Sequence, residues 1–156
     1  MLDIHIDDFC KDSALSLKIL YDAFPCNSDL LVDQIIGPDE LDDFGLHSRR
    51  HQACLATMLW LADEGLIRYG GLIQQDGVDQ AVLTNAAFSL LSSPSQVELI
   101  ETDDASIQLP TAQEEGLHFA SQITGLIPTQ SSQKIRTLML CFFAKHSESQ
   151  TNHRIL

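Results

Sequence analysis

The chain has 156 residues, of which 44% are hydrophobic and 20% charged, and its formal net charge at pH 7 is −13. A chain of this length can bury one hydrophobic core with room for a small appendage. The negative charge opposes a general DNA-coating role, because non-specific nucleic-acid binding depends on neutralising phosphates. The longest apolar run, 139–144, is far shorter than the roughly 20 residues of a membrane span, so no membrane association is expected.

The N-terminus and the cysteines both favour the cytoplasm. The first residues lack the basic start and apolar segment of a signal peptide. The four cysteines are widely spaced and form no C-x-x-C pair, which favours free thiols over a zinc ribbon or a disulfide framework. They are Cys10, Cys26, Cys54 and Cys141.

The charge is unevenly distributed along the chain. Residues 1–46 contain eleven acidic and two basic side chains, a net charge of −9, whereas residues 47–75 have a net charge of +1 and residues 129–156 of +3. The basic segments allow a local contact with DNA, and the acidic segment suits a basic protein partner.

The first expected elements are short. Asp12 or Ser13 is suited to cap a helix over 14–24, in which apolar residues recur at helical spacing. Residues 30–32 are an apolar run that fits either a strand or a half-buried turn. Pro38 favours a short helix over 39–44, which Gly45 would end.

The best-defined element is a helix from its expected cap, Ser48, to about Glu64, because this stretch contains neither glycine nor proline. Residues 53–62 are almost wholly apolar, so the helix is expected to be buried on most sides. Trp60 lies in this stretch and is expected to be substantially buried.

A hairpin and another helix are expected next. Gly65 ends the long helix, and residues 66–69 and 78–83 are predicted strands with a tight turn at Asp76-Gly77. Thr84 is then the expected cap of a short helix over 85–91.

This order of elements resembles the winged-helix (winged helix-turn-helix) superfamily of transcription regulators. Residues 58–69 are similar to that family's passage from the third helix into the first wing strand, and residues 82–91 to its passage out of the wing. The resemblance covers residues 13–92. It implies a mainly α fold with a small β-hairpin, a three-helix core and a regulatory role.

The C-terminal part is expected to be helical. The predicted division is a winged-helix domain over 1–93, an acidic linker over 94–111, a helical extension over 112–146 and a loose tail over 147–156. Within the linker, residues 95–102 fit an additional strand. Within the extension, helices are predicted over 112–127 and from Ser131 or Ser132 to about His146.

The candidate DNA contacts lie at the start of the third helix, which winged-helix proteins place in the major groove. This is the one clustered basic segment of the sequence, and arginine and glutamine side chains can read base edges there. The expected wing tip has Gln74, Gln75 and Asp76 where family members usually have a cation, which argues against strong binding. The candidate residues are Arg49, Arg50, His51, Gln52 and Thr57.

The sequence favours neither a metal site nor a catalytic site. His47, His51 and Cys54 recur at one-turn spacing, a pattern that can bind zinc. His47 precedes the expected cap, Cys54 begins the apolar stretch and no fourth ligand is near, so we expect no metal and no cofactor. No nucleophile beside a base, catalytic carboxylate pair or phosphate loop is visible, so we expect no enzyme activity.

The last expected helix has apolar residues around most of its circumference, so it either packs within its own domain or buries a face against a second copy. We expect a homodimer, with an interface formed by Leu138, Met139, Phe142 and Phe143. The predicted function is a dimeric winged-helix transcriptional regulator that contacts DNA weakly or locally through its third helix. The alternative is an acidic winged-helix adaptor module that binds proteins and not DNA.

Overall fold

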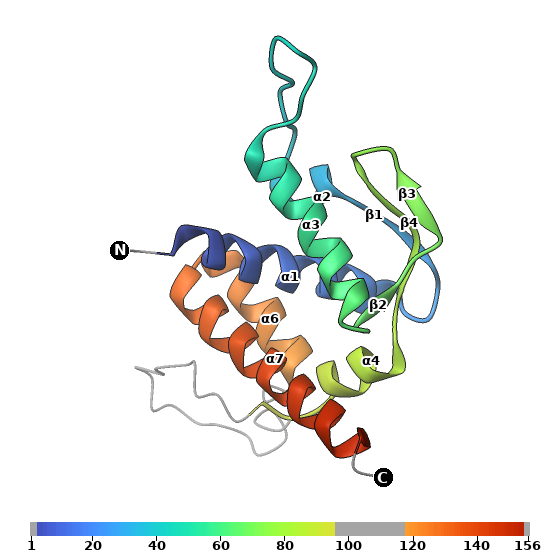
Figure 1. The fold of residues 1–156 in the computed structure, drawn as a ribbon. Helices are drawn as coiled ribbons and strands as arrows, with labels where there is room; N and C mark the ends of the chain where they lie inside the picture. The colour runs from blue at the N-terminus through green and yellow to red at the C-terminus, as the bar shows by residue number, and fades with distance from the viewer. Residues whose placement is uncertain (1–2, 96–117, 155–156) are drawn as a thin grey trace.

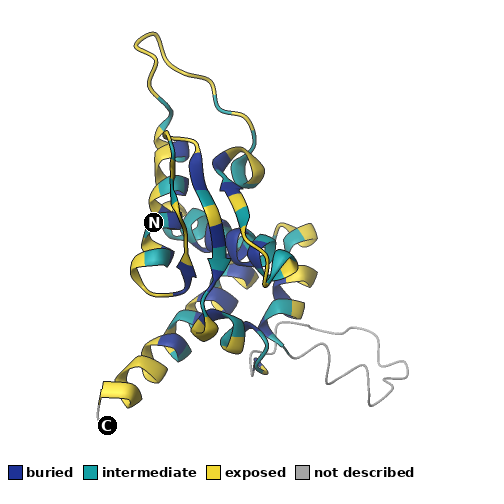
Figure 2. Ribbon diagram, turned by 90° about the vertical axis from the view of Figure 1, so that its right-hand side faces the viewer, coloured by how far each residue is buried: buried dark blue, intermediate teal, exposed yellow. Residues whose placement is uncertain are grey.

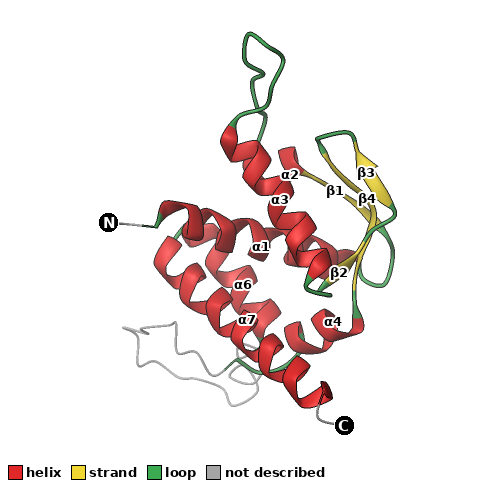
Figure 3. Cartoon of the chain, viewed as in Figure 1, coloured by secondary structure: helices red, strands yellow, loops and turns green. Residues whose placement is uncertain are grey.

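The computed structural model describes residues 3–95 and 118–154 (Figure 1). These residues form a mainly helical body with a small antiparallel sheet of four strands at one side (Figure 3). A mainly α chain with a small β-structure is therefore confirmed. In the described part of the chain, no helix has the length and apolar character needed to cross a membrane.

Helix α1 (Ile4–Ala23) begins ten residues before the predicted helix over 14–24. The helix extends this far because Cys10 is buried and Phe9 packs against the core, so the apolar face continues toward the N-terminus. Neither Asp12 nor Ser13 is a cap, since both are buried within the helix.

Strand β1 (Ser28–Leu31) confirms the strand interpretation of the apolar run, and α2 (Val32–Ile36) follows it directly. The predicted helix over 39–44 is wrong. The Asp42 carboxylate accepts hydrogen bonds from the backbone amides of Phe44 (2.9 Å) and Leu46 (2.8 Å), which stabilises a turn. Residues 37–47 therefore form a loop, which projects from the body of the molecule (Figure 1).

Helix α3 (Arg49–Asp63) confirms the predicted long helix and its cap, because Ser48 Oγ accepts a hydrogen bond from the His51 amide. Its buried residues are His51, Cys54, Thr57, Met58 and Leu61. Trp60 lies on the same helix and is 38% exposed, so its predicted burial is wrong.

The sheet consists of β1, β2 (Ile67–Arg68), β3 (Gly71–Ile73) and β4 (Gly77–Leu83), each outer strand pairing with β4. The hairpin turn differs from the expected Asp76-Gly77 turn. The Asp76 amide donates to Ile73 O, and Gly77 already belongs to β4. Helix α4 (Asn85–Leu91) follows, and Thr84 caps it as predicted.

Gly77 lies at a close contact between β4 and β1. It is paired with Leu31, and a Cβ added to it would stand 2.2 Å from the carbonyl oxygen of Leu30. No other residue type fits this position without moving β1, so the glycine is required for strand pairing and not for a tight turn.

The C-terminal helices pack on the N-terminal ones. Helix α6 (Phe119–Leu126), a 3-10 turn (Ile127–Thr129) and helix α7 (Ser132–Arg154) follow one another, and both helices lie against α1 (Figure 1). Helix α7 reaches Arg154, so the expected loose tail is helical over 147–154, although its residues are exposed (Figure 2). The expected linker and extra strand lie outside the described residues except for 94 and 95, as do 112–117 of the predicted helix over 112–127.

The core is shared by both parts of the chain. One cluster of buried residues includes Leu17 of α1, Met58 of α3, Phe119 of α6 and Phe142 of α7. Figure 2 shows the exposed residues concentrated in the projecting loop and at the C-terminal end of α7. The C-terminal helices thus complete the hydrophobic core of the N-terminal part.

Candidate functional site

The five candidate DNA contacts do not lie on one surface. Arg49 and Gln52 are exposed at the start of α3. His51 is 1% exposed and Thr57 is 5% exposed, with the Thr57 hydroxyl donating to Ala53 O at 2.9 Å. His51 and Thr57 face the protein interior, which corrects their assignment as base-reading residues.

Arg50 is engaged within the protein. Its Nη1 and Nη2 atoms donate to the two carboxylate oxygens of Asp12 at 2.6 Å each, and its Nε lies 3.5 Å from Asp8. Burial raises the pKa of Asp12, and hydrogen bonding from Arg50 offsets only part of that effect. The guanidinium therefore neutralises a buried carboxylate of α1 and is not free to meet a phosphate.

We expect Arg50→Ala to lower the free energy of unfolding by about 2 kcal/mol at neutral pH, less than for a fully buried pair because water reaches the arginine. The loss should shrink on acidification. Because burial favours protonated Asp12 in the folded state, the penalty of an unpaired carboxylate exists above its folded pKa and disappears as pH falls through it. Urea unfolding at neutral and mildly acidic pH measures both effects.

Arg49→Ala is the matched control, since Arg49 is the exposed neighbour of Arg50 on α3. It should change stability by less than about 0.5 kcal/mol. An equal loss in both variants would contradict the role assigned to the Arg50–Asp12 pair.

Four polar side chains gather beside the start of α3. His47 lies between two carboxylates, with Nδ1 3.1 Å from Asp39 Oδ2 and Nε2 3.4 Å from Asp76 Oδ1. The His47 and His51 rings stack at 3.7 Å with an interplanar angle of 4°. Hydrogen bonding by Ser48, with a smaller contribution from His47, lowers the pKa of Asp39 to about 2, so this carboxylate is ionised.

The triplet His47, His51 and Cys54 is not assembled in the structure. The Cys54 thiol is buried and lies near Asp12 and Arg50, and burial raises its pKa to about 12. Asp39 and Asp76 stand beside the two histidines instead. Sequence spacing did not reveal these two acids, because one comes from the loop before α3 and the other from the β3–β4 turn.

The exposed surface of α3 and the hairpin is not a basic strip. Among the described residues of α3 and of the β3–β4 hairpin, Arg49 is the one cation outside an ion pair. Asp63 and Glu64 lie at the other end of α3, and the hairpin turn is Gln74-Gln75-Asp76. This surface offers few groups for phosphate neutralisation.

The projecting loop over 37–47 exposes three large apolar side chains, including Phe44, the most exposed large apolar side chain of the described residues. Phe44 is 87% exposed, and Leu41 and Leu46 are each 54% exposed. The same loop contains four acidic residues and no lysine or arginine. Clustered apolar side chains with a charged surround are typical of protein-contact surfaces. Pro38 and the acidic residues predict a helix over 39–44, and that prediction gives no indication of the exposed apolar side chains.

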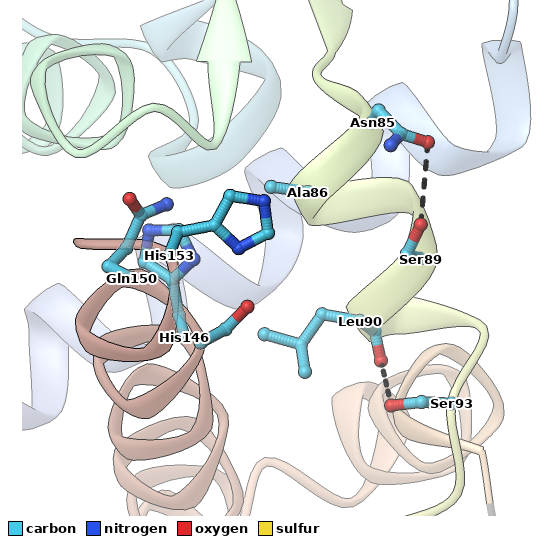
Figure 4. A pocket seen from close by; sticks show the side chains of 9 residues that line it. Asn85, Ala86, Ser89, Leu90, Ser93, His146, Gln150 and His153 are labelled. Atoms are coloured by element: carbon cyan, nitrogen blue, oxygen red, sulfur yellow. Dashed lines mark hydrogen bonds between the residues drawn. The ribbon is translucent and has the colours of Figure 1, made fainter. Parts of the chain in front are cut away.

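A groove of about 390 Å³ lies between α4 and the C-terminal half of α7 (Figure 4). The His146 Nε2 atom donates to the carbonyl oxygen of Glu64 at 2.8 Å. The hydroxyl of Ser93 donates to Leu90 O, and that of Ser89 to Asn85 Oδ1 (Figure 4). The two serine bonds are local to α4 and its C-terminal turn, and the His146 bond joins α7 to the end of α3, so none of these bonds is a nucleophile–base pair.

The expected dimer interface is corrected. Leu138, Met139 and Phe142 are at most 1% exposed and pack within their own chain. Phe143 is half-buried, stacked on Phe9 at 5.5 Å and in edge contact with Trp60 at 5.2 Å. These side chains join α7 to α1, α3 and α6, and so they do not form a surface for a second copy.

Comparison with protein-family models, with curated proteins and with solved structures gives no match to the chain. The function proposed below therefore depends on the geometry and charge of the described residues.

Proposed function

We propose that the chain is an acidic winged-helix protein-interaction module that uses the loop over 37–47 to bind a basic protein surface. The order of α1, β1, α2, α3 and the β3–β4 hairpin supports the winged-helix part of this proposal, as does the pairing of β1 with β4 beside the hairpin. The four free cysteines fit a reducing compartment such as the cytoplasm.

The single observation on which the binding role depends is the exposure of Leu41, Phe44 and Leu46 on an acidic loop. A side chain such as Phe44, 87% exposed, gains little from folding but much from entering a partner's pocket. The four carboxylates of the loop attract a basic partner and exclude an acidic one. The expected occupant is a protein surface with an apolar pocket surrounded by lysine and arginine.

The test compares proteins captured by the full chain with those captured by a Leu41→Ser, Phe44→Ser variant. Both positions are largely exposed, so the variant should keep the unfolding midpoint of the wild type. We expect the variant to bind a set of basic proteins at least tenfold more weakly than the wild type does, a loss of about 1.4 kcal/mol of binding free energy.

Leu140→Ser is the control, because Leu140 is 46% exposed on α7, far from the loop in sequence. It should capture the same proteins as the wild type. Identical capture by the wild type and the loop variant would refute the proposed contact surface.

A DNA-binding regulator is the second candidate, favoured by the exposure of Arg49 and Gln52 at the start of the third helix. The two functions predict different salt responses and different sensitive residues. DNA binding through α3 would weaken steeply with salt and would be abolished by Arg49→Glu with Gln52→Glu. The adaptor function predicts that this double variant captures the same proteins as the wild type.

A further inference from the structure

We propose that Asp39, His47 and His51 form a binding site for one zinc ion at the N-terminal end of α3. The site shares Asp39 and His47 with the protein-binding loop proposed above, but zinc binding is measured independently of protein capture. The loop before α3 and the first turn of α3 supply the ligands, and the β3–β4 turn places Asp76 beside them.

The distances between the side chains fit one small ion. Asp39, His47 and His51 each place one ligand atom within 4.8 Å of those of the other two. Modest side-chain rotations would bring such atoms to roughly 2.0–2.2 Å from a common centre. Asp76 Oδ1 lies 3.4 Å from His47 Nε2 and 3.9 Å from His51 Nε2, whereas Asp39 lies at the other ring nitrogen of His47, so water and not Asp76 would complete a four-coordinate site.

His51 gives an independent indication of a ligand. Its side chain is buried, and within the described structure neither ring nitrogen has a hydrogen-bond partner. A buried polar group without a partner is costly, and its position usually has a functional explanation. A metal ion bound to one ring nitrogen would satisfy this group.

The two histidine rings are stacked in parallel 3.7 Å apart. An imidazole binds a metal ion in the plane of its own ring, so zinc binding requires one of the two rings to rotate out of the stack. His47 precedes the Ser48 cap, so the loop and not helical spacing places it beside His51.

The donor set favours zinc over the alkaline-earth ions. Two imidazoles and one carboxylate suit zinc and neighbouring transition metals, whereas calcium and magnesium prefer oxygen ligands throughout. The closest contact in the site joins His47 Nδ1 and Asp39 Oδ2 at 3.1 Å. We therefore expect binding of zinc and of cobalt, and none of calcium.

Isothermal titration calorimetry of the full chain, freed of any affinity tag and treated with EDTA, tests the proposal with zinc chloride as the probe. All samples carry Cys26→Ser, which removes the exposed thiol as a competing ligand. We expect one zinc ion per chain, and a rise of several degrees in the unfolding midpoint when zinc is in large excess. The cobalt-loaded chain should show visible bands of nitrogen and oxygen ligands without a thiolate band.

The variants are chosen so that loss of folding does not obscure the result. His47→Ala with Asp39→Asn changes two half-buried residues and should weaken zinc binding at least 100-fold, with the fold checked by circular dichroism. His153→Ala, an exposed histidine far along α7, is the control and should bind zinc like the parent. Absence of zinc binding in the parent, or unchanged binding in the double variant, would overturn the proposal.

Discussion

Phe142→Ala is expected to lower the free energy of unfolding by about 4 kcal/mol, the largest effect of the substitutions considered. Phe142 is fully buried, with its ring in edge contact with Phe119 at 5.4 Å and with Phe143 at 5.7 Å. The substitution would remove most of a large side chain from the junction of α6 and α7 and leave a cavity that rigid helices fill poorly. Urea unfolding followed by circular dichroism measures the change.

Leu140→Ala is the matched control, two residues away on the same helix and 46% exposed. It should cost less than about 1 kcal/mol, because little apolar area returns to water. Similar losses at both positions would mean that α7 presents a different face to the core.

Gly77→Ala is expected to lower the free energy of unfolding by about 3 kcal/mol, at the upper end of the range for overpacking. The added Cβ would stand 2.2 Å from Leu30 O and 3.0 Å from Leu31 Cα, and both of these are backbone atoms. Backbone cannot rotate away as a side chain does, so β1 would have to separate from β4. For a chain of this size, the loss corresponds to a fall of roughly 6–12 °C in the thermal midpoint, measurable by calorimetry.

Gly125→Ala is the control for this prediction. Gly125 lies in α6, and a Cβ added there meets no atom within 4 Å. Alanine favours helix over glycine by up to about 1 kcal/mol, so this variant should be unchanged or more stable. A loss in Gly125→Ala as large as that in Gly77→Ala would show that strand contact is not the cause.

The sequence predicts correctly the helices that begin at a capping residue. The caps Ser48 and Thr84 are where the sequence places them, because each hydroxyl satisfies a free backbone amide at the start of its own helix. The loop over 37–47 was mispredicted, because proline and acidic residues favour a helix start and an acid-stabilised turn equally well. The turn forms and not the helix, because the Asp42 carboxylate accepts hydrogen bonds from the backbone amides of Phe44 and Leu46.

The partners of individual side chains were decided by the tertiary structure. Arg49 and Arg50 are adjacent and chemically identical, yet Arg50 alone meets Asp12, because the helical rotation of 100° per residue turns one side chain toward α1 and the other toward solvent. In the same way, Asp39 and Asp76 have no sequence relation to His47 and lie beside it only after the loop and the hairpin have folded.

By itself, the sequence determined where the capped helices α3 and α4 begin and that most of β4 is a strand, because capping, glycine and apolar spacing act over a few residues. Only the tertiary structure decided which apolar faces meet. The apolar residues of α7 fit a dimer interface and an internal core equally well in the sequence, and α1 and α6 supply the internal partner. Burial depends on contacts between residues far apart in the chain, and a periodic pattern specifies that a face is buried without specifying against what.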